Sequence, residues 1–519
     1  MTSGAQYSRT VHLPTQAATE RFAHELSLFA RIGDVIALAG DLGTGKSTFA
    51  RAFIRALSAQ GTEFDVPSPT FTLVQTYDFT RLPVAHFDFY RVVDENEIPE
   101  LGFPGLSDTM VLLAEWPERA ETFLPADRLE LTLEDGDDPG ARVLTLKAHG
   151  SWALRAQRME IISAFLDASG HHTRARAFLL GDASARRYER LQDPQGKGRP
   201  LILMDSPQMP DGRAVRDGLP YSQIAHLAEN VTAFAAIDQG LREIGLAAPQ
   251  ILASDLQAGL LVIEDLGGVV FQDMVRAQDV DLDEPYRMAV AALVRIVEEP
   301  LPDTIKLPSH ERYQVPAFDA GALEIEAELL LDWYWPAVHD GPAPDHVRAD
   351  FLAIWRTLWP RLERHQTVWC LRDYHSPNLI WRADKDGLAR LGIIDFQDAV
   401  RGHPAYDLAS LLQDARVDID ESFERKMFDH YCETRLKADG GFDRQAFQEC
   451  YAILAAQRTT KILGIFMRLK RRDGKSGYLQ HIPRLWGYLD RTLTEPILGE
   501  LKGWYDSAFP PSARRLDSA

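Results

Sequence analysis

The stretch Val35–Leu57, VIALAGDLGTGKSTFARAFIRAL, decides the fold of the N-terminal part of the chain. Residues 35–39 form a short apolar run typical of a buried strand, and residues 48–57 have helical spacing. Between them, Gly40–Ser47 follow the pattern G-x-x-x-x-G-K-S. A loop of this kind binds phosphates through its backbone N–H groups, its lysine and its hydroxyl. The sequence therefore predicts a phosphate-binding loop in an α/β domain.

The chemistry of this loop assigns roles to its side chains. We expect Lys46 to meet the outer phosphate oxygens of ATP, and Ser47 to bind Mg²⁺. Two acids at strand ends, Asp88 in HFDFYR and Glu115 in VLLAEW, are candidates to orient magnesium or water. The residues of the loop expected to contact ATP are Gly40, Asp41, Gly43, Thr44, Gly45, Lys46, Ser47 and Thr48.

Five segments in this order resemble the TsaE family, formerly YjeE, a P-loop ATPase that serves threonylcarbamoyladenosine formation on tRNA. They are GDLGTGKST, SPTFTLV (68–74), HFDFYR, LGF (101–103) and EW (115–116). The resemblance covers roughly residues 10–150. It implies a compact, mostly parallel sheet with flanking helices and magnesium near Ser47 and Glu115. Asp88 matches the second acid of the family, and Thr70 lies in its switch-like segment.

The resemblance also implies a partner, the TsaB–TsaD complex, which holds the tRNA. The formal net charge of the chain is −20, so we expect no strong direct binding to nucleic acid. A stand-alone P-loop kinase of a small molecule remains the alternative for this part.

A second motif lies in residues 366–399. Asp373 and Asn378 are separated by four residues, two short strand-like runs follow, and the second ends at Asp395-Phe396. This order is typical of the catalytic loop and metal-binding acid of protein-kinase-like enzymes. We expect Asp373 to act on the proton of the attacking hydroxyl, and Asn378 and Asp395 to hold magnesium. Asp407 is expected to anchor the catalytic loop.

A smaller β-rich lobe is expected upstream. Residues 181–190 connect two candidate strands and could cover the ATP phosphates, with Ser184 and Arg187 as contacts. The run Leu260–Glu264 followed by Leu266 suits a hinge where backbone groups bind adenine.

These features resemble the aminoglycoside phosphotransferase superfamily, and within it the AmgK family of anomeric sugar kinases. The segments concerned are GDASARRYER, LILMDSP, LLVIEDLGG, RDYHSPNLI and IIDFQDAVRGHPAYDLASLLQD, within residues 158–500. The resemblance implies phosphorylation of the anomeric hydroxyl of N-acetylmuramate or N-acetylglucosamine, in peptidoglycan recycling. It leaves the preferred sugar open.

The sequence departs from the superfamily at two positions. Leu371 replaces a catalytic-loop histidine that is mainly structural, and His375 is expected to be a structural loop residue. Residues 201–205 (LILMD) lack the lysine that binds ATP phosphates. Another cation must supply that charge, and we expect Arg187 or Arg190 to do so.

The sugar pocket is predicted from a polar and aromatic cluster in a helical stretch. Carboxylates bind sugar hydroxyls and aromatic faces stack on pyranose rings, but an amphipathic helix with a buried tryptophan explains the pattern equally well. The resemblance singles out Glu328 and Trp333 as substrate contacts. The cluster consists of Glu326, Glu328, Asp332, Trp333 and Tyr334.

Length and composition agree with several domains. The 519 residues are 45% hydrophobic and 25% charged, which is typical of folded protein. Three cysteines suit a reducing compartment, and no apolar run is long enough to cross a membrane, so we expect a cytoplasmic protein. We predict a TsaE-like α/β domain (1–152) and an α+β bilobal kinase-like domain, with an N-lobe (153–266) and a helical C-lobe (267–519).

Two alternatives remain for the C-terminal part. An aminoglycoside or choline-type kinase would need an acidic pocket for its cationic substrate, whereas a sugar acid needs a basic group near its carboxylate. The other alternative is a pseudokinase that regulates the ATPase. Its one support in the sequence is the absence of a lysine from residues 201–205. Nothing in the sequence shows that the two parts communicate, and the oligomeric state is open.

Overall fold

The chain divides into two compact units in the computed structural model. One comprises residues 1–182 and 188–200, and the other comprises residues 183–187 and 201–519. The structure describes residues 6–58, 64–179, 186–209, 212–277, 280–339, 341–362 and 367–514. In these residues no helix combines the length and the apolar character needed to cross a bilayer.

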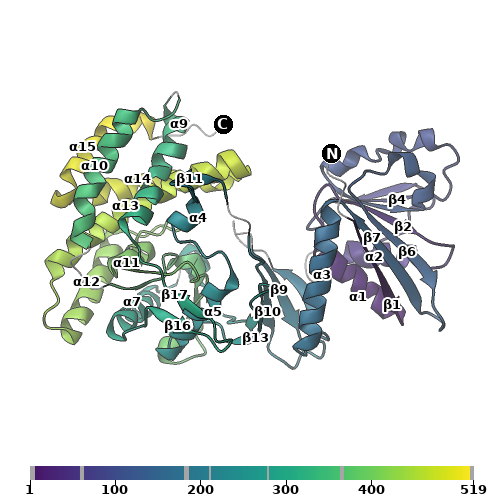
Figure 1. Ribbon diagram of the computed structural model, residues 1–519, viewed down its shortest axis with the longest axis horizontal. Coiled ribbons are helices and arrows are strands. Elements are labelled where there is room, and N and C mark those ends of the chain that lie inside the picture. The colour runs from purple at the N-terminus through teal and green to yellow at the C-terminus, as the bar shows by residue number, and fades with distance from the viewer. Residues whose placement is uncertain are drawn as a thin grey trace. The chain divides into compact units, whose positions relative to one another are not determined.

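The first unit is built on a seven-stranded sheet of order β1-β7-β6-β2-β5-β4-β3 (Figure 1). Its four central strands, β6, β2, β5 and β4, run parallel, and the pairs at both edges are antiparallel. The hairpin predicted around residues 134–140 is the β6–β7 pair. The strands are β1 (Gln6–Leu13), β2 (Val35–Ala39), β3 (Val74–Tyr77), β4 (Val84–Asp88), β5 (Val111–Glu115), β6 (Leu129–Asp135) and β7 (Arg142–His149).

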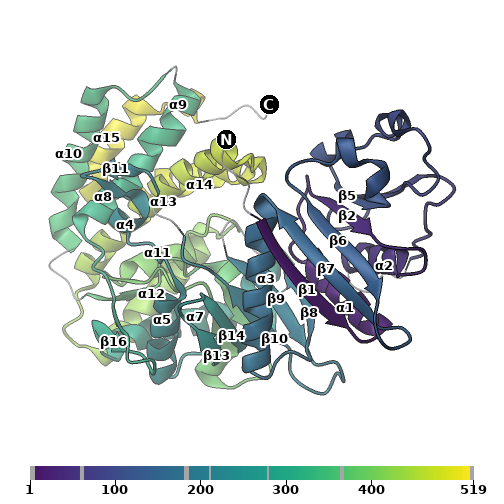
Figure 2. The same ribbon diagram turned by 45° about the vertical axis from the view of Figure 1, so that its right-hand side comes forward.

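Three helices accompany this sheet. Helix α1 (Gln16–Ser27) packs on α2 (Lys46–Ala56), with the rings of Phe22 and Phe49 6.5 Å apart. Helix α3 (Ser151–Ala168) contacts β1 and β7, and Figure 2 shows it beside that edge of the sheet. The buried Arg155 of α3 binds both carboxylate oxygens of Asp34, at 2.7 and 2.6 Å. The helix that we expected to open the kinase part is therefore joined to the N-terminal sheet.

An antiparallel strand pair, β8 (Ala175–Leu179) and β9 (Arg187–Gln192), completes this unit. Arg176 and Glu189 form a buried bidentate ion pair across the two strands, at 2.7 and 3.1 Å. Glu25 of α1 lies 3.9 Å from Arg176, and Arg81 lies over the ring of Phe178. These contacts attach the strand pair to α1 and to the segment between β3 and β4.

The Arg176–Glu189 ion pair is expected to stabilise this unit. Arg176→Met leaves the Glu189 carboxylate buried without its charge partner, which costs about 3–5 kcal/mol of unfolding free energy. Urea unfolding of the full chain measures the loss. The control is Arg295→Met, which removes an exposed pair with Glu299 and should change stability by less than about 1 kcal/mol. Equal effects of the two variants would contradict the prediction.

Strands of the second unit form short antiparallel groups. β14 (Leu260–Glu264) lies between β10 (Leu201–Asp205) and β13 (Ile251–Asp255). β19 (Leu379–Trp381) pairs with β15 (Val269–Val270) and with β20 (Leu391–Ile393), which is the hairpin predicted after the catalytic loop. The remaining strands are β11 (Ala214–Arg216), β12 (Leu219–Pro220), β16 (Thr304–Lys306), β17 (Arg312–Gln314), β18 (Val368–Cys370) and β21 (Val400–Gly402).

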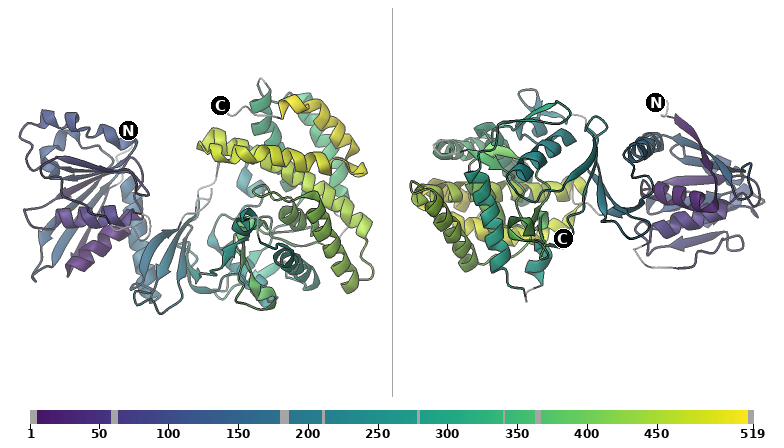
Figure 3. Two further views of the ribbon diagram at one scale, coloured as in Figure 1. Left: turned by 180° about the vertical axis from the view of Figure 1, so that it is seen from behind. Right: turned by 90° about the horizontal axis from the view of Figure 1, so that it is seen from below.

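Helices make up the rest of the second unit, and those coloured green to yellow pack together (Figure 3). The longest, α13, is buried along its middle and packs on α8, α11 and α14. The helices are α4 (Tyr221–Ile224), α5 (Val231–Glu243), α6 (Phe271–Arg276), α7 (Asp283–Glu298), α8 (Ala320–Leu329), α9 (Trp335–Val338), α10 (Asp345–Leu362), α11 (Ala405–Leu412), α12 (Glu421–Ala438), α13 (Arg444–Asp473), α14 (Ile482–Thr492) and α15 (Gly499–Ala508).

Candidate active sites

The phosphate-binding loop joins the end of β2 to the start of α2, as predicted. Gly40, Gly43 and Gly45 all have positive φ. At Gly40 a Cβ atom would lie 2.2 Å from the carbonyl oxygen of Leu133, so both the backbone conformation and the close approach require glycine. Thr48 lies in the first turn of α2. The loop thus presents its backbone N–H groups at a helix N-terminus, where anions bind.

The predicted acids meet at the loop because their strands are parallel neighbours. Glu115 is in register with Leu38 of β2 and with Asp88 of β4, so all three strands end together. Ser47 Oγ donates to Glu115 Oε2 at 2.9 Å. Thr70 Oγ1 donates to Asp88 Oδ2, also at 2.9 Å, which brings the switch-like segment to the same edge.

Lys46 is largely buried at the base of the loop. Its Nζ donates to the carbonyl oxygens of Gly40 and Asp41, at 2.7 and 2.8 Å, and lies 3.9 Å from the ring centroid of Trp116. Burial lowers the pKa of Lys46, while nearby acids, Glu115 first, act in the opposite direction. The loop therefore holds the ammonium group through its own carbonyl groups.

His86 is a site residue that the sequence reasoning missed. It lies within the quoted segment HFDFYR, on β4, and is fully buried. Its Nε2 lies 2.9 Å from Glu115 Oε1, the oxygen that Ser47 does not contact. His86 therefore fixes the orientation of the Glu115 carboxylate. The sequence signal that could have found it is its position two residues before Asp88, which predicts that the two side chains lie on the same face of the strand.

Arg142 at the start of β7 also went unnoticed. Its Nε donates to the Thr44 carbonyl oxygen at 2.7 Å, and its Nη2 donates to that of Gly43 at 3.2 Å. Through these hydrogen bonds, two carbonyl groups of the loop point toward the Arg142 guanidinium. Arg142 is therefore placed to fix the loop conformation in which N–H groups bind phosphate.

Arg142→Met is expected to weaken ATP binding at this loop by about ten- to a hundredfold, because hydrogen bonds to a charged group contribute roughly 1.5–3 kcal/mol. Calorimetric titration with ATP measures the change. Arg128→Met is the matched control, since Arg128 pairs with Glu130 and does not contact the loop. Unchanged ATP affinity in Arg142→Met would show that the loop keeps its conformation without the arginine.

In the second unit, the structure brings Asp373, Asn378 and Asp395 together. Asn378 Nδ2 donates to the Asp373 carbonyl oxygen at 2.9 Å and lies 3.4 Å from Asp395 Oδ2. Asp395 Oδ1 accepts from Gln397 Nε2 at 2.8 Å. Burial and the nearby charge of Asp373 raise the pKa of Asp395 to about 6. The two acids thus repel each other unless a cation lies between them.

Buried acids hold the catalytic loop in place. Asp407 accepts hydrogen bonds from the backbone N–H groups of Leu371 and Arg372, at 2.6 and 2.9 Å, which is the anchoring role predicted for it. Asp414 accepts from Ser376 N at 2.7 Å. Burial raises the pKa of Asp407 to about 7. Arg372 and Asp395 both have positive φ, a strained backbone that clusters at functional sites.

The contacts of His375 agree with a structural role. Its Nδ1 lies 2.8 Å from the Asp373 carbonyl oxygen, and its Nε2 contacts Arg416. Burial and the charge of Arg416 lower the pKa of this histidine. The side chain therefore supports the loop as a neutral group.

The predicted sugar cluster is divided between two faces of its helix. Glu326 is fully buried and contacts Arg372, Gln457 and Lys461, with its Oε1 2.7 Å from Lys461 Nζ. It stabilises the arginine next to Asp373 and is not exposed to a sugar. The acids of the cluster therefore do not share one face, because residues two apart on a helix point to nearly opposite sides.

Glu328 lies on the other side and is buried under two arginines. It contacts Arg216, and its Oε1 accepts from Arg348 Nη1 at 3.1 Å. Residues 330–334 form a π-helical turn, which includes the partly exposed Trp333. Irregular turns of this kind are frequent at functional sites. No contact brings Glu328 or Trp333 to the catalytic loop in the described residues.

The arginines before β10 have different neighbours in the structure. Arg187 pairs with Asp205 at the end of β10, at 3.1 Å. Arg186 instead contacts one of the predicted site acids: its Nη1 donates to Asp395 Oδ1 at 3.0 Å. Arg190 lies on β9, opposite Ala177 of β8. Ser184 lies outside the described residues.

The predicted hinge follows β14. Glu264 at its end accepts from Arg382 Nη2 at 3.3 Å, and its N–H donates to the Gln250 carbonyl oxygen at 2.8 Å. Leu266 is buried, and its Cδ1 would lie 2.9 Å from a Cβ atom added at Gly392. The segment is thus packed against β20, which runs toward Asp395.

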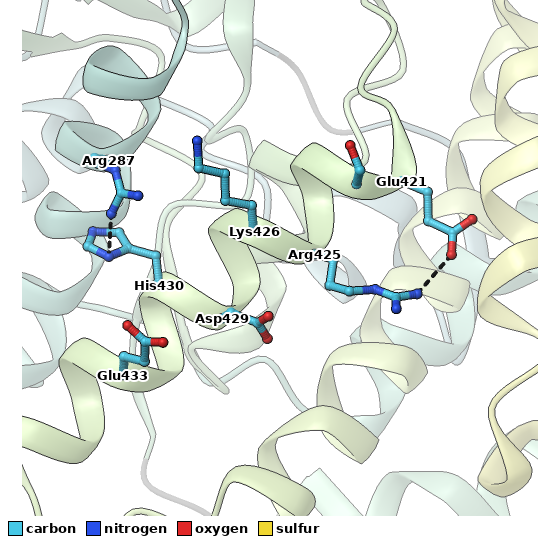
Figure 4. A pocket seen from close by; sticks show the side chains of 8 residues that line it. Arg287, Glu421, Arg425, Lys426, Asp429, His430 and Glu433 are labelled. Carbon is cyan, nitrogen blue, oxygen red and sulfur yellow. Dashed lines mark hydrogen bonds and ion pairs between the residues drawn. The ribbon is translucent and has the colours of Figure 1, made fainter.

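An open depression on α12 and α7 lies among residues that have no predicted role (Figure 4). Its charged side chains pair with each other: Arg287 Nη1 lies 2.9 Å from His430 Nδ1, and Arg425 pairs with Glu421. The lining residues are Arg287, Glu421, Ser422, Arg425, Lys426, Asp429, His430 and Glu433.

Comparison with known proteins finds two families along the chain. Threonylcarbamoyl adenosine biosynthesis protein TsaE matches residues 13–143, and the phosphotransferase enzyme family matches residues 175–449, more than half of the chain. The tRNA threonylcarbamoyladenosine biosynthesis protein TsaE of Bacillus subtilis is 40% identical over 138 residues, 26% of this chain and 81% of the relative. The chain belongs to the TsaE family and to the phosphotransferase enzyme family.

Relatives of the phosphotransferase part carry a more specific name. The N-acetylmuramate/N-acetylglucosamine kinase of Caulobacter vibrioides is 39% identical over 368 residues, 70% of this chain and 99% of the relative. The kinase of the same name from Pseudomonas aeruginosa is 30% identical over 327 residues, 62% of this chain and 84% of the relative. Both resemblances found in the sequence, and the fold classes they imply, are confirmed.

Both sites offer oxygen ligands that suit magnesium. Ser47 Oγ and Glu115 Oε2 lie 2.9 Å apart beside the TsaE loop, and Asp395 Oδ2 faces Asn378 in the phosphotransferase part. The described residues contain no group of three or more His, Cys, Asp or Glu side chains that could hold a metal. Mg²⁺ commonly uses one or two carboxylates together with substrate phosphates and water.

Proposed function

We propose that the chain joins two ATP-dependent enzymes. The TsaE part is the ATPase of tRNA threonylcarbamoylation, and the phosphotransferase part phosphorylates the anomeric hydroxyl of N-acetylmuramate or N-acetylglucosamine. The observation that supports the second activity best is the meeting of Asp373, Asn378 and Asp395, in a chain that covers 99% of the Caulobacter kinase.

In the TsaE part, we propose that ATP binds at Gly40–Thr48. Lys46 contacts its outer phosphates, and Ser47 and Glu115 hold magnesium, which neutralises phosphate charge. Asp88 orients the attacking water, and Thr70, bonded to it at 2.9 Å, links the switch-like segment to that step. The partner is the TsaB–TsaD complex, through which this part acts on tRNA.

In the kinase part, Asp373 accepts the proton of the anomeric hydroxyl. The sugar oxygen forms a bond to the γ-phosphorus of ATP, the bond from that phosphorus to the bridging oxygen breaks, and ADP leaves. Asn378 and Asp395 hold magnesium against the phosphates, and the segment Glu264–Leu266 receives adenine. These steps depend on positioning and electrostatics and need no covalent intermediate.

Groups of both signs surround Asp373. Burial acts to raise the pKa of Asp373, but nearby cations, among them Lys461 and Arg372, lower it. Glu326 contacts both of these cations. Glu328 and Trp333 stay candidates for sugar contacts. We place the protein in the cytoplasm, where its three buried, unpaired cysteines suit a reducing environment.

A substrate panel tests the kinase proposal. The full chain carrying Lys46→Ala receives ATP and one acceptor at a time: N-acetylmuramate, N-acetylglucosamine, kanamycin or choline. We expect ADP release only with the N-acetyl sugars. Turnover with kanamycin or choline alone would assign the enzyme to another branch of the family. For the TsaE part, ATP hydrolysis that rises on addition of TsaB–TsaD is the expected result.

A further inference from the structure

Strand β10 leaves the phosphotransferase part without a cation at the position where related kinases carry a lysine. Its residues, Leu201–Asp205, are all buried, and the only charged one is an acid. Asp205 is itself neutralised by Arg187, at 3.1 Å. The cation that binds the ATP phosphates must therefore come from another residue.

Arg186 stands next to the acids of the site. Its Nη1 lies 3.0 Å from Asp395 Oδ1, and the side chain is 15% exposed. Gln397 contacts the same oxygen at 2.8 Å, whereas Asp395 Oδ2 faces Asn378. Arg186 thus contacts Asp395 Oδ1, which does not face Asn378. Asp395 Oδ2 remains available to bind the metal.

The charge balance of the site calls for such a cation. Asp373 and Asp395 bring two carboxylates together, and ATP adds the negative charges of its phosphates. The guanidinium group keeps its charge at any physiological pH and binds phosphate with two parallel N–H groups, which suits a bridge between a carboxylate and a phosphate.

We propose that Arg186 is the catalytic residue that binds the ATP phosphates in the kinase site, in the role that a strand lysine has in related enzymes. Arg187 does not take this role, because its partner is Asp205 at the end of β10, whereas the partner of Arg186 is Asp395, next to Asn378. The inference rests on the proposed kinase function, since it places ATP beside Asp395.

Nucleotide affinity tests the proposal separately from sugar turnover. In the full chain carrying Lys46→Ala, Arg186→Gln is compared with Arg186→Lys, and with the neighbouring replacements Arg187→Gln and Arg190→Gln. Calorimetry gives the dissociation constants of ATP and of adenosine for each variant. The ratio of the two constants separates phosphate binding from folding, because a structural defect weakens both ligands alike.

We expect Arg186→Gln to weaken ATP at least tenfold and to leave adenosine within twofold, with the KM for ATP raised and the KM for the sugar unchanged. Arg186→Lys should recover most of the ATP affinity. An unchanged ATP-to-adenosine ratio in Arg186→Gln, or a tenfold change in Arg187→Gln or Arg190→Gln instead, would overturn the proposal. A parent chain that phosphorylates no sugar would refute the kinase function, while the affinity ratio would still decide the role of Arg186.

Discussion

Asp373→Asn lowers kcat for sugar phosphorylation by about 10²–10⁴-fold, the range expected for the loss of a general base. The amide keeps the size of the side chain but cannot take the proton of the anomeric hydroxyl. ATP affinity should stay within about threefold, because Asp373 acts on the acceptor and Asn378 and Asp395 are intact. Initial rates of ADP release with N-acetylmuramate measure the effect.

Asp418→Asn is the matched control for this experiment. Asp418 is an exposed aspartate whose side chain pairs with Arg484, away from the catalytic loop. Its replacement should leave kcat within twofold. A chain with Asp373→Asn that retains more than about a tenth of the parent rate would contradict the role of Asp373 as the base.

Lys46→Ala is expected to lower ATP hydrolysis by the TsaE part by about 10²–10³-fold, the cost of removing one preorganised group that stabilises charge in a transition state. The lysine is held at the base of the loop by two carbonyl groups. Hydrolysis is measured in the presence of TsaB–TsaD and without sugar. Lys147→Ala, on the exposed face of β7, is the control.

The same variant tests whether the two parts communicate. If the activities are independent, Lys46→Ala leaves kcat and KM of sugar phosphorylation unchanged within experimental error. A shift of either constant by more than about threefold would show that the TsaE site influences the kinase site.

Local motifs made much of both sites predictable. The strand, loop and helix of residues 35–57 form one continuous segment, so their arrangement follows from the pattern itself. Asp88 and Glu115 could be placed beside the loop because the carboxyl ends of parallel strands meet at one edge. In the kinase part, Asp373 and Asn378 share a short loop, and a hairpin returns the chain to Asp395.

Contacts between distant segments could not be predicted. Arg142 binds a carbonyl group 98 residues before it, and Arg186 meets a carboxylate 209 residues after it. Such pairs depend on which strands become neighbours, and a single sequence carries no record of that. The sequence analysis named Arg187 and Arg190 and not Arg186, because the contact of Arg186 with Asp395 joins segments far apart in the chain.

Helical periodicity could have improved one interpretation. Glu326 and Glu328 were grouped as one polar cluster, although their spacing separates them on a helix. In the structure, Glu326 contacts Arg372, next to Asp373, whereas Glu328 contacts Arg216 and Arg348. The attachment of α3 to the sheet of the first unit depends on the Arg155–Asp34 pair, whose members are 121 residues apart.

Phosphorus NMR of the reaction product tests the central claim most directly. The full chain carrying Lys46→Ala is incubated with ATP, Mg²⁺ and N-acetylmuramate. The account predicts a sugar phosphate whose phosphorus couples to the anomeric proton, and which forms at less than about a tenth of the parent rate when Asp373→Asn is added. A phosphate on any other hydroxyl of the sugar, or formation of this product by the Asp373→Asn chain at more than about a tenth of the parent rate, would contradict it.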